Sequence, residues 1–113
     1  MGINNQARAT SIGTSPFFIL AGSTTAAYST TPAICQLFID INLIAAGDEF
    51  KVKLLEKIDG STVRTCYEAN IAPQSNKGWV SPQFIMHDNG WDWSVEKVSG
   101  TDRALPIELR YVT

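Results

Sequence analysis

Apolar and polar residues alternate through residues 33–69, and this period of two constrains the local structure more than any other feature. The apolar members are Cys35, Leu37, Ile39, Ile41 and Leu43 in a first run and Phe50, Val52 and Leu54 in a second. A period of two places such side chains on one face of a strand, whereas a helix would scatter them. We therefore expect two strands that share one core, with six residues inside it: Leu37, Ile39, Ile41, Phe50, Val52 and Leu54.

Two turn signals separate the runs of this stretch. Residues 45–48 break the first run, and Asp59-Gly60 follows the second. Asp-Gly readily adopts the positive φ angles of tight hairpin turns, and residues 62–69 then return with β-branched and aromatic side chains. The three runs together predict an antiparallel three-stranded meander.

The rest of the chain has short strand-like segments and no helical pattern. Residues 17–21, 79–87, 91–98 and 107–111 are strand-like, and Pro82 places its segment at a sheet edge or a bulge. Residues 88–90 are predicted to form a second hairpin turn, and residues 99–102 another turn. We expect an all-β fold: a single antiparallel, jelly-roll-like β-sandwich of seven or eight short strands over residues 17–113. Residues 1–16 are predicted to be an N-terminal arm, or one weak strand over residues 7–12.

Charge and hydropathy favour neither nucleic acid nor a membrane as a partner. The net charge is −2, and charged residues make up 18% of the chain. A weakly acidic chain has no global attraction for phosphate backbones or anionic lipid. No apolar run approaches the ~18 residues of a membrane span, and the start of the chain lacks a signal-peptide pattern. We expect a soluble protein made in a cytosol.

The two cysteines are expected to be buried, free thiols. Cys35 and Cys66 lie on the first and third strands of the predicted meander. The middle strand would hold them roughly 9–10 Å apart, and a disulfide needs Cα atoms within about 7 Å.

No set of residues predicts catalysis, a metal or a cofactor. His87 is the single histidine, and it precedes a turn, so we expect it to be exposed. The carboxylates are scattered over predicted turns and outward strand positions, which leaves no acid–base pair. We expect no enzymatic activity.

Two surface features allow alternative interpretations. Lys51, Lys53 and Lys57 project from one strand, either as a solvated face, which we favour, or as a basic stripe for an acidic partner. Trp91 and Trp93 share a strand face, and burial is favoured over a platform for carbohydrate or protein.

Two segments resemble a family of small bacteriophage and prophage proteins encoded among virion structural genes. The first runs from Leu43 through Gly47-Asp48 to a strand ending in Leu-x-Glu-Lys (54–57), and continues through the Asp-Gly turn to Val63-Arg64-Thr65-Cys66-Tyr67. The second, residues 95–106, leads from a strand to Gly100-Thr101, then Arg103, then an apolar-Pro step at Leu105-Pro106. The resemblance covers about two-thirds of the chain and none of residues 1–33.

The resemblance implies a virion component, above all a decoration (cement) protein on the outside of a phage head. Its partners would be the major capsid protein and itself, with a homotrimer favoured because such proteins sit where three capsomers meet. A head–tail or tail-associated structural protein, and a sandwich that binds glycans on the host surface, remain alternatives.

The N-terminal third is expected to contribute to assembly. Residues 1–39 contain one charged side chain, Arg8, and a nearly uncharged surface invites association. We expect this third to attach the protein to the shell and residues 1–16 to be separable from the sandwich. The candidate assembly contacts are Phe17, Phe18, Ile19, Tyr28, Trp91 and Trp93.

Overall fold

A computed structural model describes residues 2–74 and 77–113 and contains eleven β-strands and no helix in those ranges. The strands are β1 (Ile3–Arg8), β2 (Ser11–Ile12), β3 (Phe17–Phe18), β4 (Ala33–Asp40), β5 (Glu49–Glu56), β6 (Arg64–Ile71), β7 (Gly78–Val80), β8 (Phe84–Met86), β9 (Trp91–Ser99), β10 (Arg103–Ala104) and β11 (Ile107–Val112). The predicted all-β fold is confirmed. The number of strands exceeds the expected seven or eight because β2 and β10 are two-residue strands and Pro82 divides one strand into β7 and β8.

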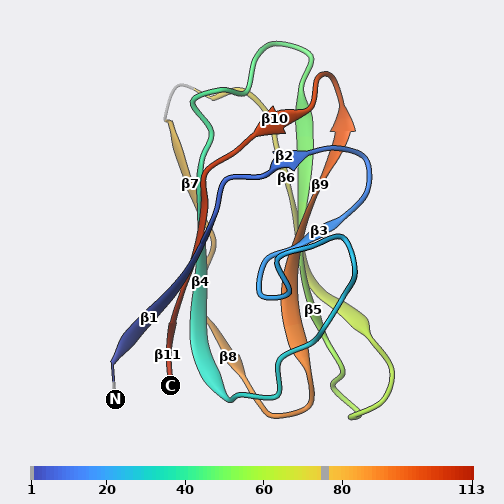
Figure 1. Ribbon diagram of the computed structural model, residues 1–113, viewed down its shortest axis with the longest axis vertical. Helices are drawn as coiled ribbons and strands as arrows, with labels where there is room; N and C mark the ends of the chain where they lie inside the picture. The colour runs from blue at the N-terminus through green and yellow to red at the C-terminus, as the bar shows by residue number, and fades with distance from the viewer. Residues whose placement is uncertain (1, 75–76) are drawn as a thin grey trace.

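Two antiparallel sheets face each other across a shared core (Figure 1). Sheet A has the order β1-β11-β4-β7, and β8 also pairs with β4 beyond β7. Sheet C has the order β3-β9-β5-β6, and β10 pairs with β2 at the upper end of the molecule in Figure 1. Both sheets therefore mix strands from the beginning, middle and end of the chain.

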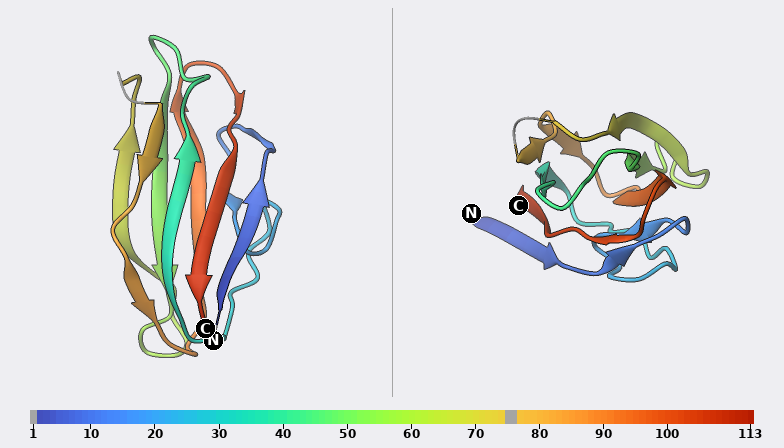
Figure 2. Two further views of the ribbon diagram at one scale, coloured as in Figure 1. Left: turned by 90° about the vertical axis from the view of Figure 1, so that its left-hand side faces the viewer. Right: turned by 90° about the horizontal axis from the view of Figure 1, so that it is seen from above.

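The strand pairs are nested around the β5–β6 hairpin. Moving outward from that hairpin, β4 pairs with β7 and β8, β3 with β9, β2 with β10, and β1 with β11. The chain is thus one long antiparallel hairpin rolled so that successive pairs fall in alternate sheets, which is the strand order of a jelly roll. The first and last strands are neighbours for this reason, and the two termini lie close together (Figure 2).

The predicted three-stranded meander is wrong, although its second half, the β5–β6 hairpin, is confirmed. β4 belongs to sheet A and β5 to sheet C, and residues 41–48 cross from one sheet to the other. Alternation identified the buried face of each strand correctly, but strands of two facing sheets bury the same kind of face. The alternation pattern therefore cannot distinguish two strands that pair within one sheet from two strands that pack against each other across the core.

The second predicted hairpin is also wrong, because residues 87–90 join β8 in sheet A to β9 in sheet C. Gly90 has a φ of 108° and Gly60 a φ of 82°, so both turns use the left-handed conformation that glycine allows. Asp59 and Asn89 do not have positive φ, so neither turn is the two-residue type that their sequences suggested.

All six predicted core residues are confirmed in one buried cluster. Leu43 is 52% exposed instead, because β4 ends at Asp40 and the chain has already turned away. Both cysteines are free thiols. Burial raises the pKa of Cys35 to about 11, but Cys66 is exposed, which corrects the expectation that both are buried.

Residues 2–16 are part of the sheets, which corrects the predicted N-terminal arm. β1 pairs with β11 over six residues, and β2 pairs with β10. Ile12 is fully buried in the core. Arg8 donates hydrogen bonds from Nε to the Ile19 carbonyl (2.9 Å) and from Nη2 to that of Leu20 (3.3 Å). Removing residues 2–16 would take away two strands, β1 and β2, a core residue and these bonds, so the segment is not separable.

Candidate assembly surface

A row of apolar side chains crosses the outer face of sheet A from one edge to the other. Strand register places Ile3 of β1 beside Val112, Val112 beside Ile34, and Ile34 beside Ile85. Ile3 is 80% exposed, Ile34 47% and Ile85 86%. We call these four residues the isoleucine row. A continuous row of exposed apolar side chains is typical of a surface that another molecule covers.

A second row of the same face lies nearer the upper end of the molecule, and it is mixed. It contains Ala7, Glu108, Phe38 and Val80 in cross-strand order. Arg110, from the row between, forms an ion pair with Glu108 and lays its guanidinium over the Phe38 ring at 3.9 Å from the centroid. The charges on this face therefore pair with one another, and the aromatic ring is partly covered by its neighbour.

The outer face of sheet C differs, because charged side chains cover it in pairs. Lys51 lies 3.0 Å from Glu68, and Lys53 lies 3.4 Å from Glu96. Lys57 stands 5.3 Å from the centre of the Tyr28 ring. Lys51 and Lys53 of β5 are thus matched to acidic neighbours, and Lys57, which follows β5, to an aromatic ring of the same chain. This supports the solvated-face interpretation over a basic stripe for an acidic partner.

Sheet C is also covered by its own chain along β9. Asp92, which is fully buried, accepts hydrogen bonds from the backbone N–H of Leu20 (2.8 Å), Ala21 (3.2 Å) and Trp93 (2.7 Å). Burial raises the pKa of Asp92, while these donors and the charge of Arg8 act in the opposite direction. The segment after β3 is therefore fastened over the outer side of β9, and sheet A has no such strap in the described residues.

Most of the predicted assembly contacts are core residues. Trp91, Trp93 and Ile19 are at most 1% exposed, and Phe17 is 5% exposed. Trp93 donates from Nε1 to Cys35 Sγ at 3.4 Å, and Trp91 donates to the Thr31 carbonyl at 2.9 Å. Because β9 lies between β3 and β5 and faces sheet A, no tryptophan platform is available on it. Burial, the favoured interpretation, is confirmed for both.

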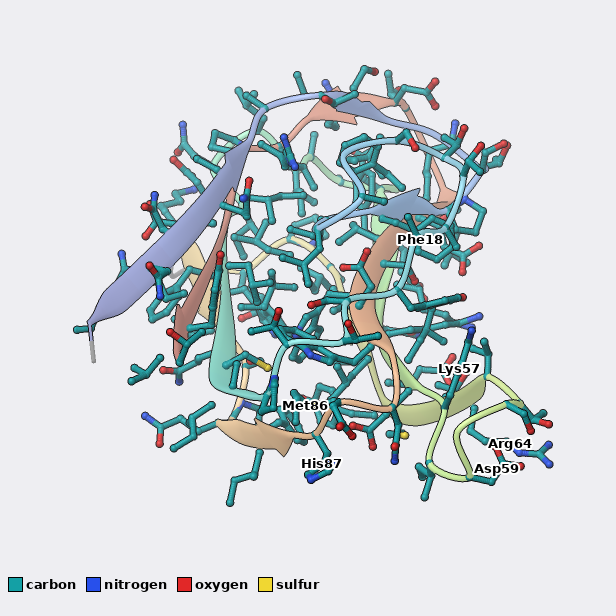
Figure 3. All side chains as sticks on the ribbon, turned by 60° about the horizontal axis from the view of Figure 1, so that its bottom comes forward. Phe18, Lys57, Asp59, Arg64, Met86 and His87 are labelled. Atoms are coloured by element: carbon teal, nitrogen blue, oxygen red, sulfur yellow. The ribbon has the colours of Figure 1, made fainter. Side chains whose placement is uncertain are left out.

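Phe18 and Tyr28 are the two predicted contacts that reach the surface. Both are half-buried, and their rings meet edge to face with centroids 6.2 Å apart. Phe18 and Lys57 lie on the same side of the molecule in Figure 3, and the Tyr28 ring lies beside both, whereas the isoleucine row belongs to sheet A. The structure thus brings these two together but separates them from the apolar face of sheet A.

The scarcity of charge in residues 1–39 has a largely internal cause. Within this third, seven apolar side chains are buried in the chain's own core: Ile12, Phe17, Ile19, Ala33, Cys35, Leu37 and Ile39. What remains uncharged and exposed is chiefly β1 and the Ser/Thr-rich residues 23–32. The chain's own core therefore accounts for part of the low charge, and coverage of the remaining exposed residues by a partner stays a prediction.

The two segments that carry the family resemblance meet in space. Asp48 accepts hydrogen bonds from the N–H of Ala45 (2.9 Å) and Thr101 (2.9 Å) and from Arg103 Nε (2.8 Å). These bonds lower the pKa of Asp48 to about 2. A Cβ on Gly100, whose φ is 89°, would lie 2.1 Å from Asp48 Oδ1. The Gly-Asp and Gly-Thr phrases therefore fix one corner of the sandwich and have a structural role.

The histidine, cysteine and acidic side chains of the described residues are dispersed. No group of three or more His, Cys, Asp or Glu side chains lies close enough together there to hold a metal ion. His87 is exposed at the lower end of the molecule, as predicted, and pairs with Asp88 at 2.6 Å (Figure 3). Among those residues there is also no helix long and apolar enough to cross a membrane.

The outward positions of β4 contain a sequence signal for the exposed apolar row, and the alternation argument did not use it. In β4 the outward positions are Ile34, Gln36, Phe38 and Asp40, so two of four are apolar. A strand with one solvated face should be polar at such positions.

Comparison with known proteins adds no further guide: no protein-family model, curated protein or solved structure matches the chain.

Proposed function

We propose that this protein is a non-enzymatic structural component of a phage virion, a decoration protein that sits on the outer surface of the capsid through the outer face of sheet A. The observation that carries the proposal is the contrast between the two outer faces. Sheet C carries paired charges and a strap from its own chain, whereas sheet A presents the isoleucine row to solvent. A row of exposed apolar side chains across one sheet is typical of an assembly surface.

Two further arguments support the same role. The residue patterns at residues 43–67 and 95–106 resemble those of phage virion proteins. The jelly-roll order is an architecture that viral capsid domains use, although lectins and cupins share it, so the fold argument is one of analogy. The glycan-binding alternative has lost its platform, since Trp91 and Trp93 are buried.

The proposal moves the attachment site from the N-terminal third as a whole to one face. That face includes β1 and part of β4 from the N-terminal third, but also β7, β8 and β11. A tail or head–tail position would use the same surface chemistry, and a trimer stays a prediction based on the resemblance.

The test compares two valines that differ in little except the sheet. Val80 in sheet A is 48% exposed and Val98 in sheet C is 49% exposed. Each would be changed to lysine, and each variant would be mixed with empty phage heads and sedimented. We expect Val80→Lys to abolish co-sedimentation and Val98→Lys to leave it unchanged, while both variants melt like the parent. Equal binding by the two variants, or attachment of the parent to tails, would contradict the proposal.

A further inference from the structure

The four edges of the two sheets are protected to different degrees. Exposed edge strands invite pairing with other chains, and proteins limit this with short strands, prolines, charges and bulges. β3 is two residues long, and the β7–β8 edge is broken into two three-residue strands around Pro82. β6 carries Arg64 and Glu68 and has a bulge opposite Leu54 and Leu55.

β1 has none of these protections. It is six residues long, pairs without a register shift, and has β11 as its one partner among the described residues. Its sequence, INNQAR, has no proline and one charge, and the guanidinium of that residue, Arg8, is tied to the Ile19 and Leu20 carbonyls. Figure 2 shows β1 as the outermost strand of sheet A, with its N-terminal end projecting from the body. Its outward backbone groups are therefore available to another strand.

We propose that β1 pairs with β1 of a second copy, antiparallel and about a two-fold axis through Asn5. The partner is a second copy because β1 complements itself. In antiparallel sheets, opposite residues share a face, so residues of the two copies must pair odd with odd and even with even. Ile3, Asn5 and Ala7 form the outer set, and Asn4, Gln6 and Arg8 the inner set.

Two registers satisfy this condition with five residue pairs each within β1, one centred on Asn5 and one on Gln6. The register centred on Asn5 has the better partners: it sets Ile3 opposite Ala7, Asn4 opposite Gln6, and Asn5 opposite its own copy. Two amide pairings and an apolar pair result, and no charges meet. The isoleucine row of one copy then continues into the second row of the other, so that Ile3, 80% exposed, gains Ala7 of the second copy as a neighbour. The alternative register centred on Gln6 has as many pairs, but it leaves the exposed Ile3 without a partner inside β1 and sets Arg8 against Asn4.

Introducing a positive or a negative charge at Asn5 tests this contact in the isolated protein. The Asn5 side chain is exposed, and it neither donates a hydrogen bond to a described residue nor accepts one from it. Asn5→Lys and Asn5→Asp would each place like charges opposite each other across the axis, and each should weaken self-association by roughly fivefold. An equal mixture of the two variants should restore it, since Lys then faces Asp. Sedimentation equilibrium of the 12.4 kDa chain measures each case.

A cysteine pair tests the register. In a Cys66→Ser background, Asn5→Cys should form an intermolecular disulfide on mild oxidation, because the two Cα atoms are directly opposite. Gln6→Cys should not, because its copies would be about 8 Å apart, beyond the ~7 Å that a disulfide spans. A parent protein that stays monomeric at millimolar concentration, a trimer insensitive to both charges, or cross-linking at Gln6 alone would overturn the proposal. None of these outcomes depends on whether the protein binds a phage head.

Discussion

The outer faces of sheet A and sheet C show how differently one chain can treat two sides of the same core. On sheet C, every lysine of β5 has an acidic partner from β6 or β9, and residues 19–21 are fastened to Asp92. On sheet A, Ile3, Ile34, Val80 and Ile85 remain between 47% and 86% exposed. Intramolecular contacts thus account for the paired charges of sheet C, and for the apolar row of sheet A we propose an intermolecular contact.

The difference also separates stability from assembly. The buried side chains of β9, from Trp91 to Val95, lie between a facing sheet and a strap, so their loss should unfold the protein. Outward side chains of sheet A touch little of their own chain, so their loss should change association and leave the fold intact. Substitutions in the two regions can test this division directly.

The largest effect is expected at Trp93. Its side chain is fully buried and contacts Tyr67 and Phe84, with ring centroids 6.2 and 5.6 Å away. Trp93→Ala should lower the free energy of unfolding by about 3–5 kcal/mol. Phe38→Ala, on the outer face of sheet A under Arg110, should cost about 1 kcal/mol. Urea denaturation measures both free energies. A comparable loss at the two positions would contradict the expected division between a stabilising β9 and an outer face of sheet A that contributes little to stability.

The strap over β9 is tested at Asp92. Asp92→Ala leaves three backbone N–H groups without their acceptor and should cost about 3 kcal/mol. Burial raises the pKa of Asp92, so the folded state holds a proton more tightly and stability falls as pH rises through and above the unfolded value near 4. Asp92→Asn should therefore cost less than Asp92→Ala at neutral pH. The exposed Asp88→Ala is the control and should melt like the parent.

The corner at Asp48 should make the fold acid-sensitive. Its folded pKa is about 2 and its unfolded pKa is near 4, so its contribution is complete above about pH 4 and disappears as the pH falls to 2. Asp48→Asn should lower the melting temperature at pH 7 and flatten its decline between pH 4 and pH 2. Thermal melts across that range measure this. If the melting temperature of Asp48→Asn declined between pH 4 and pH 2 as steeply as that of the parent, other carboxylates would be responsible for the acid sensitivity.

The smallest effect is expected for the surface pairs of sheet C. Lys53 and Glu96 are 3.4 Å apart and partly solvated, so a double-mutant cycle should give a coupling of about 0.5 kcal/mol. High salt should reduce it further. A coupling several times larger would mean that the charged face stabilises the fold, and the contrast with sheet A would then be one of strength as well as of chemistry.

The sequence by itself determined the class of the fold and the identity of much of the core. Alternation in residues 35–41 and 50–54 identifies the buried face of a strand, because successive side chains of a strand point in opposite directions wherever it pairs. All six expected core residues are buried for this reason. Pro82 correctly indicated an interrupted edge, and the position of His87 indicated exposure, since both are consequences of local geometry.

Only the tertiary structure decided which strands pair and which surfaces remain bare. β4 and β5 have the alternation of neighbours but lie in opposite sheets, since hydrogen-bonding partners leave no trace in a single strand's pattern. Phe17, Ile19 and Trp91 were candidates for external contacts, but strands distant in sequence cover them. The isoleucine row was hidden for the same reason: Ile3, Ile34 and Ile85 are far apart in the chain, and only the register of β1, β11, β4 and β8 aligns them.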